Sequence, residues 1–345
     1  MSEHQQQLPE FIRFLLEPAA YSHPAAGVEL VQTHISYVLL AGDYVYKFKK
    51  PVNFGFLDFS DLAKRRHFCG EELRLNRRLC PELYLGLVTV GEEGGKLRLT
   101  EGEGAAGTVV EYGIKMARMP EAGMMANLIA RGELSADHLD RIIAKLAPFY
   151  QAADNGPEVR ALGTAEAVGV NVLENFAQTE GFIGCPALSR AQFDVIGSYS
   201  RRFLAREELF AARIAADRIR EGHGDLYSAN ICFAGPELYI FDCIEFNQRF
   251  RCCDVASDIG FLVMDLDFHG LESLSAHLAE NFARQANDPG LLTMLRFYTC
   301  YRAYVRGKIG LFTAHAPEVD PATKEKSLAM AARYFALAER YARQG

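Results

Sequence analysis

The 345-residue sequence lacks several features that mark common functional classes. It has no excess of basic residues, because 37 lysines and arginines face 44 aspartates and glutamates, whereas proteins that follow nucleic-acid phosphates are normally basic. It has no apolar run of the roughly 18 residues that span a bilayer, and its polar start, residues 1–7, is not typical of a secretory signal. We therefore expect neither a nucleic-acid partner nor a membrane segment.

The eight cysteines include no C-x-x-C pair, and Cys252 and Cys253 are adjacent. We therefore expect reduced thiols in a cytoplasmic protein. The sequence also has no internal repeat or low-complexity segment, and only residues 155–163 resemble a linker. A chain of this length can bury a large core and form two lobes or domains.

One short stretch carries the residue types that a phosphoryl-transfer site needs. It reads His-Gly-Asp-Leu-Tyr-Ser-Ala-Asn over residues 223–230, and Asp242 follows at the end of the apolar run 238–241. Transfer of a γ-phosphoryl group requires an acceptor hydroxyl held in line and phosphate charge neutralised by Mg²⁺. Kinase-type loops place an Asp near the hydroxyl and, five residues later, an Asn on the metal. Asp225 and Asn230 have this spacing.

Residues 231–233 and 238–241 predict two short strands joined by a turn, a hairpin that folds Asp242 back beside the loop. His-Gly-Asp, four more residues and Asn, followed by a hairpin that ends in Asp, resembles the aminoglycoside phosphotransferase and choline kinase family of the protein-kinase-like fold. The similarity is closest to bacterial aminoglycoside phosphotransferase-like proteins of unassigned substrate. Members of that group often carry an added C-terminal P-loop ATPase domain, of which these 345 residues show no sign.

The resemblance implies a role for each polar residue of the motif. Asp225 would be the catalytic base, Asn230 and Asp242 would hold Mg²⁺, and His223 would brace the loop. One residue departs from the family pattern, because Tyr227 stands where a His is common.

A kinase site also needs a strand Lys for the nucleotide phosphates and a Glu on the next helix to hold it. Residues 28–33, 36–40 and 44–49 are rich in β-branched and aromatic side chains and predict three strands. Lys47 lies inside the third strand, and alternation places Lys49 on the same face as a rival candidate. We prefer Lys47 because it lies within the strand.

The next helix is predicted from Ser60, as its N-cap, to Leu79, before the stop at Pro81. Glu72 shares one face of this helix with three apolar residues, Phe68, Leu75 and Leu79. An unpaired charge on such a face would cost on the order of several kcal/mol. Glu72 is therefore predicted to pair with Lys47.

One alternative to that pairing is left open. Glu72 could instead be exposed and paired with Arg65 or Arg66. Its neighbour Glu71 is expected to point elsewhere and to be solvated.

Two further groups are assigned by their order along the chain. The turn at 33–36 should cover the phosphates, and although it lacks glycine, its backbone amides and the Ser36 hydroxyl are candidates for contacts with phosphate oxygens. After a strand predicted at 108–116, residues 117–120 should connect the lobes, with backbone groups of Ala117 and Met119 receiving the adenine.

Two phosphate-binding signatures are set aside. Residues 102–107 match the dinucleotide fingerprint, but a strand follows them where a helix is required, so we predict a hairpin turn. Residues 94–96 resemble the end of a P-loop, but Leu97 replaces the required Ser or Thr, which indicates another turn.

Beyond Pro120, apolar residues recur at helical spacing. The predicted helices cover residues 124–132, 135–154, 165–179, 189–221, 270–286, 289–307 and 321–343. The prediction is an α+β, protein-kinase-like two-lobe fold. Residues 1–119 would form a small nucleotide-binding lobe with an antiparallel sheet and one helix, and residues 120–345 a large, mainly helical catalytic and substrate-binding lobe.

Carboxylates after Asp242 leave several interpretations open. Glu245 is either an outer-shell or acceptor contact or a surface carboxylate. Asp258 could cap the following helix, and the family resemblance implies that it and Asp254 support the catalytic loop. Residues 265–269 contain two Asp and a His that could suggest a metal cluster, but the polar end of a helix is the preferred interpretation.

The leading hypothesis is an ATP- and Mg²⁺-dependent phosphotransferase that moves the γ-phosphate of ATP to a hydroxyl of a small molecule. The alternatives are a pseudokinase-like nucleotide-binding module, nucleotidyl transfer on the same fold, and a metallohydrolase. The metallohydrolase would use His223, Asp225, Asp242 and Asp254 as ligands. The identity of the acceptor, the preference for ATP or GTP, and the oligomeric state stay open.

Overall fold

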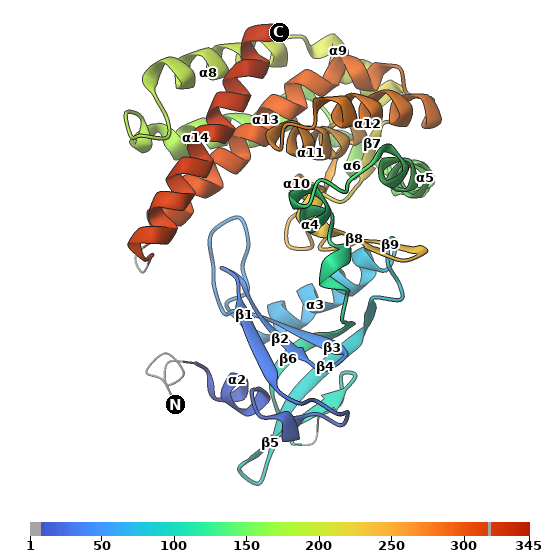
Figure 1. The fold of residues 1–345 in the computed structure, drawn as a ribbon, viewed down its shortest axis with the longest axis vertical. Helices are drawn as coiled ribbons and strands as arrows, with labels where there is room; N and C mark the ends of the chain where they lie inside the picture. Colours follow the sequence, from blue (N-terminus) through green and yellow to red (C-terminus); the bar gives the residue numbers. More distant parts are fainter. Residues whose placement is uncertain (1–7, 106, 317–318) are drawn as a thin grey trace. The chain divides into compact units, whose positions relative to one another are not determined.

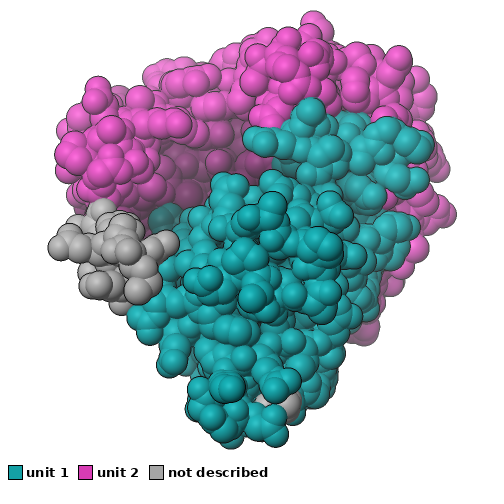
Figure 2. All heavy atoms as spheres, turned by 60° about the horizontal axis from the view of Figure 1, so that its bottom comes forward, with its two compact units in different colours: residues 1–124, 232–247 teal, residues 125–231, 248–345 magenta. Residues whose placement is uncertain are grey.

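The computed structural model describes residues 8–105, 107–316 and 319–345, in two compact units. The first unit is Met1–Met124 with Cys232–Asn247, and the second is Met125–Ile231 with Gln248–Gly345 (Figure 2). The sequence-based division after residue 119 differs, because it assigns residues 232–247 to the C-terminal lobe. Residues 1–7, predicted not to be a signal, and Ala106 of the predicted hairpin turn lie outside the described residues.

The first unit is built on a six-stranded antiparallel sheet with the strand order β1-β2-β3-β6-β4-β5 (Figure 1). Its strands are β1 (Val28–Gln32), β2 (Ser36–Ala41), β3 (Tyr44–Lys49), β4 (Tyr84–Glu93), β5 (Lys96–Glu101) and β6 (Thr108–Ala117). The four predicted strands are confirmed. β4 and β5 are additional, and the two glycine-containing segments connect strands as predicted.

Helices cover both faces of this sheet. α2 (Glu10–Leu15) packs on one face around Phe48, and α3 (Leu62–Asn76) packs on the other around Ile114. Side chains alternate across a strand, so Phe48 on the α2 face leaves its two lysine neighbours on the α3 face. Two 3₁₀ turns, Pro18–Ala20 and Glu121–Gly123, and the hairpin of β8 (Ile231–Ala234) and β9 (Glu237–Ile240) complete the unit.

The ends of α3 differ from the prediction. Asp61, not Ser60, is the N-cap, and its carboxylate accepts a hydrogen bond from the Lys64 amide at 2.8 Å. Ser60 instead donates its hydroxyl to Asp58 at 2.6 Å. The helix ends at Asn76, and residues 77–79 form turns.

The second unit is mainly helical. Its helices are α4 (Met125–Ala130), α5 (Ala136–Ala152), α6 (Pro157–Ala161), α7 (Ala165–Thr179), α8 (Arg190–Leu204), α9 (Glu207–Ala215), α10 (Gln248–Arg251), α11 (Val255–Phe268), α12 (Glu272–Gln285), α13 (Gly290–Ala314) and α14 (Pro321–Gln344). α11 is central, because residues 255–266 are all buried and it packs against α12 and α13. The strands β7 (Ile219–Glu221) and β10 (Cys252–Asp254) pair antiparallel beside its N-terminus.

Two predictions for this unit are wrong. The single helix predicted over 189–221 is α8, α9 and β7, and Asp217, at φ +61°, cannot continue a right-handed helix. The linker predicted at 155–163 contains α6, which starts at Pro157, a residue suited to the first helical turn. None of the described helices combines the length and apolar character that crossing a lipid bilayer requires.

Candidate active site

Lys47 and Glu72 form the predicted ion pair within the first unit. The Lys47 ammonium on β3 donates to Glu72 Oε1 on α3 at 2.8 Å, and Glu72 is fully buried while the Lys47 side chain is 16% exposed. The alternative partners of Glu72 are wrong, because Arg65 and Arg66 pair with other glutamates. The predicted pairing of Glu72 with Lys47 is therefore confirmed.

Lys49, the rival candidate, binds the same carboxylate. Its ammonium donates to Glu72 Oε2 at 2.7 Å and also pairs with Glu245. Lys49 is 1% exposed and Glu245 6% exposed, so the interpretation of Glu245 as a surface carboxylate is wrong. Because two buried carboxylates surround Lys49, Lys47 is the more accessible lysine for a ligand.

Asp242 follows β9 and lies against Lys47, with 2.6 Å between Lys47 Nζ and Asp242 Oδ1. Its φ of +64° is in the left-handed region, which costs a non-glycine residue roughly 1–2 kcal/mol. Buried groups hold this conformation: the Asp242 N–H donates to the Tyr84 hydroxyl at 3.3 Å, and the Cys243 N–H donates to Asn76 at 2.9 Å. The Asp242 side chain nevertheless stays 44% exposed.

These five side chains form a charged cluster of two ammonium and three carboxylate groups: Lys47, Lys49, Glu72, Asp242 and Glu245. Burial alone would lower the pKa of Lys47, but Asp242 and Glu72 outweigh burial and keep this pKa well above its ordinary value. Burial would raise the pKa of Glu72, but Lys47 and Lys49 hold it below its usual range. One negative charge is left over, so the cluster favours an additional cation.

The second unit holds the predicted catalytic loop, between β7 and β8. The Asn230 side-chain amide donates to the Asp225 backbone carbonyl at 2.9 Å and to its carboxylate at 3.1 Å. This orientation leaves the Asn230 side-chain oxygen as the atom for a cation. His223 is fully buried, and its Nδ1 accepts a hydrogen bond from the Asp225 N–H at 3.3 Å, which braces the loop as predicted.

Asp258 supports this loop from the first turn of α11. Its buried carboxylate accepts hydrogen bonds from the N–H groups of His223 and Gly224, at 2.7 and 2.9 Å, and from the Tyr150 hydroxyl at 3.1 Å. Glycine at position 222 permits this approach, because a Cβ there would lie 2.3 Å from the Asp258 carboxylate. The supporting role is confirmed, whereas the capping alternative is wrong.

The cap of α11 is Asp254, whose carboxylate accepts the Ala256 N–H at 2.9 Å. Asp254 also pairs with the buried Arg213 at 2.7 Å, and Arg213 binds Asp288 as well. These contacts make Asp254 a structural support and leave no role for it as a metal ligand. Among the described residues there is no group of three or more His, Cys, Asp or Glu side chains that could hold a metal ion.

Two arginines near the loop were not predicted. Arg302 on α13 is buried and donates to the Gly224 carbonyl at 2.9 Å. One turn later, the Arg306 guanidinium lies over the Tyr227 ring, 4.8 Å from its centroid. The sequence of α13 alone does not show which other elements these arginines contact.

Comparison with solved structures relates this fold to small-molecule kinases. Choline kinase from Cryptosporidium parvum Iowa II matches with a TM-score of 0.54 and 8% identity, over 99% of this chain and 95% of that chain. The chain has a protein-kinase-like fold. Plasmodium vivax ethanolamine kinase matches with a TM-score of 0.50 and 10% identity, over 97% of this chain and 84% of that chain. The two-lobe α+β fold implied by the sequence resemblance is confirmed.

Sequence comparison finds relatives of greater length. Uncharacterized proteins of Mycobacterium tuberculosis (strain ATCC 25618 / H37Rv) and Mycobacterium bovis (strain ATCC BAA-935 / AF2122/97) are each 31% identical over 295 residues. The match includes 84% of this chain and 56% of each relative, so the chain spans little more than half of their length. No family model matches the sequence.

In the turn at 33–36, which was predicted to cover the phosphates, backbone amides form hydrogen bonds within the turn itself. The Thr33 hydroxyl accepts the Ser36 N–H at 2.9 Å and the Ile35 N–H at 3.3 Å, so these amides are already used. Ser36 is buried, and its hydroxyl has no hydrogen-bond partner within the described part of the chain. The structure therefore does not present the Ser36 hydroxyl or these amides to a phosphate.

The segment that follows β6 has fewer unbonded backbone N–H groups than the prediction required. The Ala117 N–H donates to the Leu83 carbonyl at 2.9 Å, and the Arg118 N–H donates to the Asp43 carbonyl at 2.8 Å. These bonds leave the backbone of Met119 as the better candidate for adenine, and its role stays a prediction.

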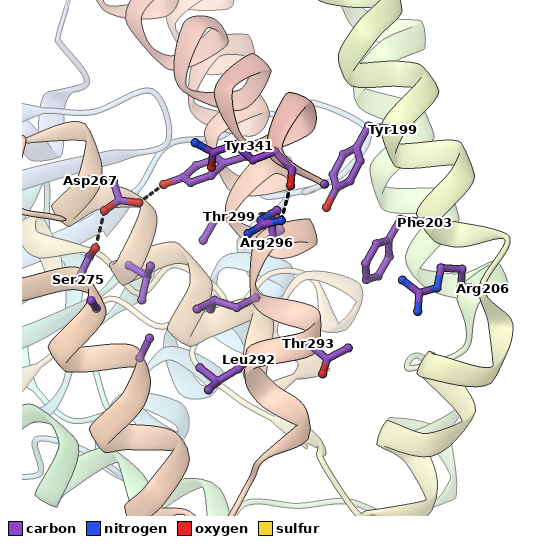
Figure 3. Close-up of a pocket in the computed structure, with 16 residues that line it drawn as sticks. Tyr199, Phe203, Arg206, Asp267, Ser275, Leu292, Thr293, Arg296, Thr299 and Tyr341 are labelled. Carbon is purple, nitrogen blue, oxygen red and sulfur yellow. Dashed lines mark hydrogen bonds between the residues drawn. The ribbon is translucent and has the colours of Figure 1, made fainter. Parts of the chain in front are cut away.

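A cavity of about 500 Å³ lies elsewhere in the second unit, among α8, α11, α12, α13 and α14 (Figure 3). At its wall, Asp267 accepts hydrogen bonds from the Ser275 and Tyr341 hydroxyls, and Arg296 donates to the Gln344 carbonyl. The predicted site residues are not among the described residues that line it. The hydrogen bonds of Asp267 fit the polar helix end expected at 265–269.

Proposed function

We propose that this chain is an ATP- and Mg²⁺-dependent phosphotransferase that moves the γ-phosphate of ATP to a hydroxyl of a small molecule. The proposal rests on one observation: this kinase-like fold carries both sets of polar side chains that phosphoryl transfer requires. The first unit holds the Lys47–Glu72 pair next to Asp242, and the second holds Asp225 linked to Asn230.

On the nucleotide side, Lys47 would bind the α- and β-phosphates, with Glu72 fixing its position. The Lys47 ammonium stays charged, because Asp242 and Glu72 keep its pKa well above the ordinary value despite burial. The backbone of Met119 is the candidate for the adenine contact.

The residues present suit Mg²⁺. Asp242 and Asn230 offer oxygen ligands, which Mg²⁺ prefers, and the charged cluster around Lys47 carries one uncompensated negative charge. Mg²⁺ sites in such enzymes take one or two protein ligands and complete their shell with phosphates and water. When bound, the ion would neutralise charge on the phosphates.

On the acceptor side, Asp225 would orient the acceptor hydroxyl and take its proton. The loop is prepared for this task, because His223, Asn230 and the supports from Asp258 fix its backbone before any substrate binds. General-base action of this kind contributes about 10²- to 10⁴-fold in rate.

The test is a screen of small hydroxy compounds with labelled ATP and Mg²⁺, followed by product analysis. Wild-type protein should release ADP and label one class of acceptor. Asp225→Asn should lower the rate at least about 10²-fold and leave nucleotide binding, measured by titration calorimetry, within twofold of wild type. Asp137→Asn, the same change at an exposed position in the first turn of α5, is the matched control and should be as active as wild type.

Three outcomes would contradict the proposal. An undiminished rate in Asp225→Asn would remove its role as base. Release of pyrophosphate in place of ADP would indicate nucleotidyl transfer. Tight ATP binding with no turnover across the whole screen would favour a nucleotide-binding module.

A further inference from the structure

Arg306 on α13 lies next to the proposed catalytic loop and has a distinctive environment. Its guanidinium carbon is 4.8 Å from the centroid of the Tyr227 ring and 5.6 Å from that of the Tyr334 ring, so it lies between aromatic faces of the loop and of α14. Tyr227 in turn stacks on Phe261 of α11, with centroids 5.4 Å apart and planes 12° from parallel. The arginine is thus held in place by ring faces.

No carboxylate within the described residues forms an ion pair with Arg306, and its Nε is buried without a hydrogen-bond partner there. Arg213 of the same unit, by contrast, is bound by Asp254 and Asp288. An arginine held by aromatic rings keeps its planar set of donors for an external anion.

Arg306 lies close to the loop that contains Asp225, the proposed catalytic base. Arg302, one helical turn earlier, donates to the Gly224 carbonyl, which places this face of α13 against the loop. Tyr227, the ring beneath Arg306, is two residues from Asp225, and the Asp225 carboxylate interacts electrostatically with the guanidinium.

We propose that Arg306 is the anion-binding residue of the acceptor site, so that the acceptor is a small hydroxy compound carrying a carboxylate or phosphate group. This inference rests on the proposed phosphotransferase function and specifies its substrate class. A guanidinium binds either anion through two parallel N–H donors, which would hold the hydroxyl of the same molecule near Asp225. Cationic acceptors would be repelled by the same charge.

The experiment compares acceptors that differ in charge. Glycerate and glycerol 3-phosphate represent the two anions, glycerol is neutral, and choline and ethanolamine are cationic; each is also a starting point for larger hydroxy compounds of its class. We expect anionic acceptors to be preferred, with the ratio of glycerate to glycerol 3-phosphate rates identifying the anion. Arg306→Gln should lower kcat/KM for the anionic acceptor about 10- to 100-fold and leave KM for ATP within twofold.

Two further variants control for structure. Arg306→Lys keeps the charge and should retain more activity than Arg306→Gln, whereas a purely structural role predicts that both follow the loss of thermal stability. Arg190→Gln, the same change at an exposed position on α8, should leave all constants unchanged.

A preference for neutral or cationic acceptors would overturn the inference while leaving phosphotransfer intact. A rise in the KM for ATP in Arg306→Gln would also overturn it, by assigning the residue to the nucleotide. If no acceptor is phosphorylated, the proposed function fails, and titration of glycerol 3-phosphate and glycerate into wild type and Arg306→Gln decides the anion site by itself. Binding at least tenfold weaker in the variant supports the site, and equal or absent binding in both refutes it.

Discussion

Replacing Asp258 with Asn tests whether the carboxylate under the proposed catalytic loop determines the local stability of that loop. The wild-type carboxylate accepts hydrogen bonds from the N–H groups of His223 and Gly224 and from the Tyr150 hydroxyl, with Arg302 at 3.5 Å. Asparagine has nearly the same shape but only one accepting oxygen. One loop amide would then face an N–H donor, and the remaining bonds would lose their charge.

The magnitude follows from these bonds. A hydrogen bond to a charged group contributes about 1.5–3 kcal/mol, and a buried amide left without an acceptor costs about 1–3 kcal/mol. We therefore expect the free energy of local opening of the loop to fall by about 3 kcal/mol, which corresponds to about a 10²-fold change in the opening equilibrium. The effect should be confined to the loop and the N-terminal turn of α11.

Hydrogen exchange measured by mass spectrometry reports this quantity directly. In Asp258→Asn, the peptide that contains His223 and Gly224 should exchange about 10²-fold faster than in wild type. Asp267→Asn is the matched control on the same helix, because Asp267 binds the Ser275 and Tyr341 hydroxyls and should not alter the loop peptide. Equal exchange in Asp258→Asn and wild type would show that the carboxylate does not hold the loop.

Three other predictions concern the charged groups of each unit. Lys47→Met should weaken ATP binding at least tenfold with little loss of stability. Lys49→Met should mainly lower the melting temperature, because it removes the buried ammonium that lies between the carboxylates of Glu72 and Glu245. Calorimetry and thermal melting separate the two variants, and the reverse order would make Lys49 the nucleotide lysine. Asp288→Asn should destabilise the second unit by about 1.5–3 kcal/mol, because Arg213 loses one of its two buried charged partners and keeps Asp254. Denaturation showing under about 1 kcal/mol would refute this. Burial lowers the pKa of Lys308 to about 8, so between pH 8 and 10 the unfolded chain binds more protons at this residue, and the contribution of Lys308 to stability should rise with pH. The melting temperature of wild type relative to Lys308→Met should therefore increase from pH 8 to 10, and a constant difference would contradict the prediction.

The parts of the site that could be predicted from the sequence are those set by local periodicity. Strand alternation placed Lys47 and Lys49 on one face, and the apolar face of the following helix indicated that Glu72 needs a cationic partner. The loop at 223–230 was recognised by the spacing of its carboxylate and amide, whereas the roles of its residues came from the family resemblance. Each signal lies within one element, where backbone geometry fixes the direction of the side chains.

Contacts between distant elements could not be predicted in this way. The burial of Glu245 against Lys49 depends on how the segment after β9 packs in the first unit, which no local pattern encodes. The aromatic environment of Arg306 combines rings from the loop and from α14. The predicted helix over 189–221 was wrong because periodicity alone does not reveal a left-handed residue such as Asp217.

Because Glu72 pairs with two lysines, the stability of the first unit does not depend on Lys47 alone. If Lys47 binds a phosphate as proposed, Glu72 would keep Lys49 as a counter-ion 2.7 Å away and would not be left as an isolated buried charge. With a single lysine, each binding event would expose the interior of the unit to an unpaired carboxylate. Lys49 therefore neutralises the buried charge of Glu72 at all times, and Lys47 would be able to bind a ligand without weakening the sheet on which it lies.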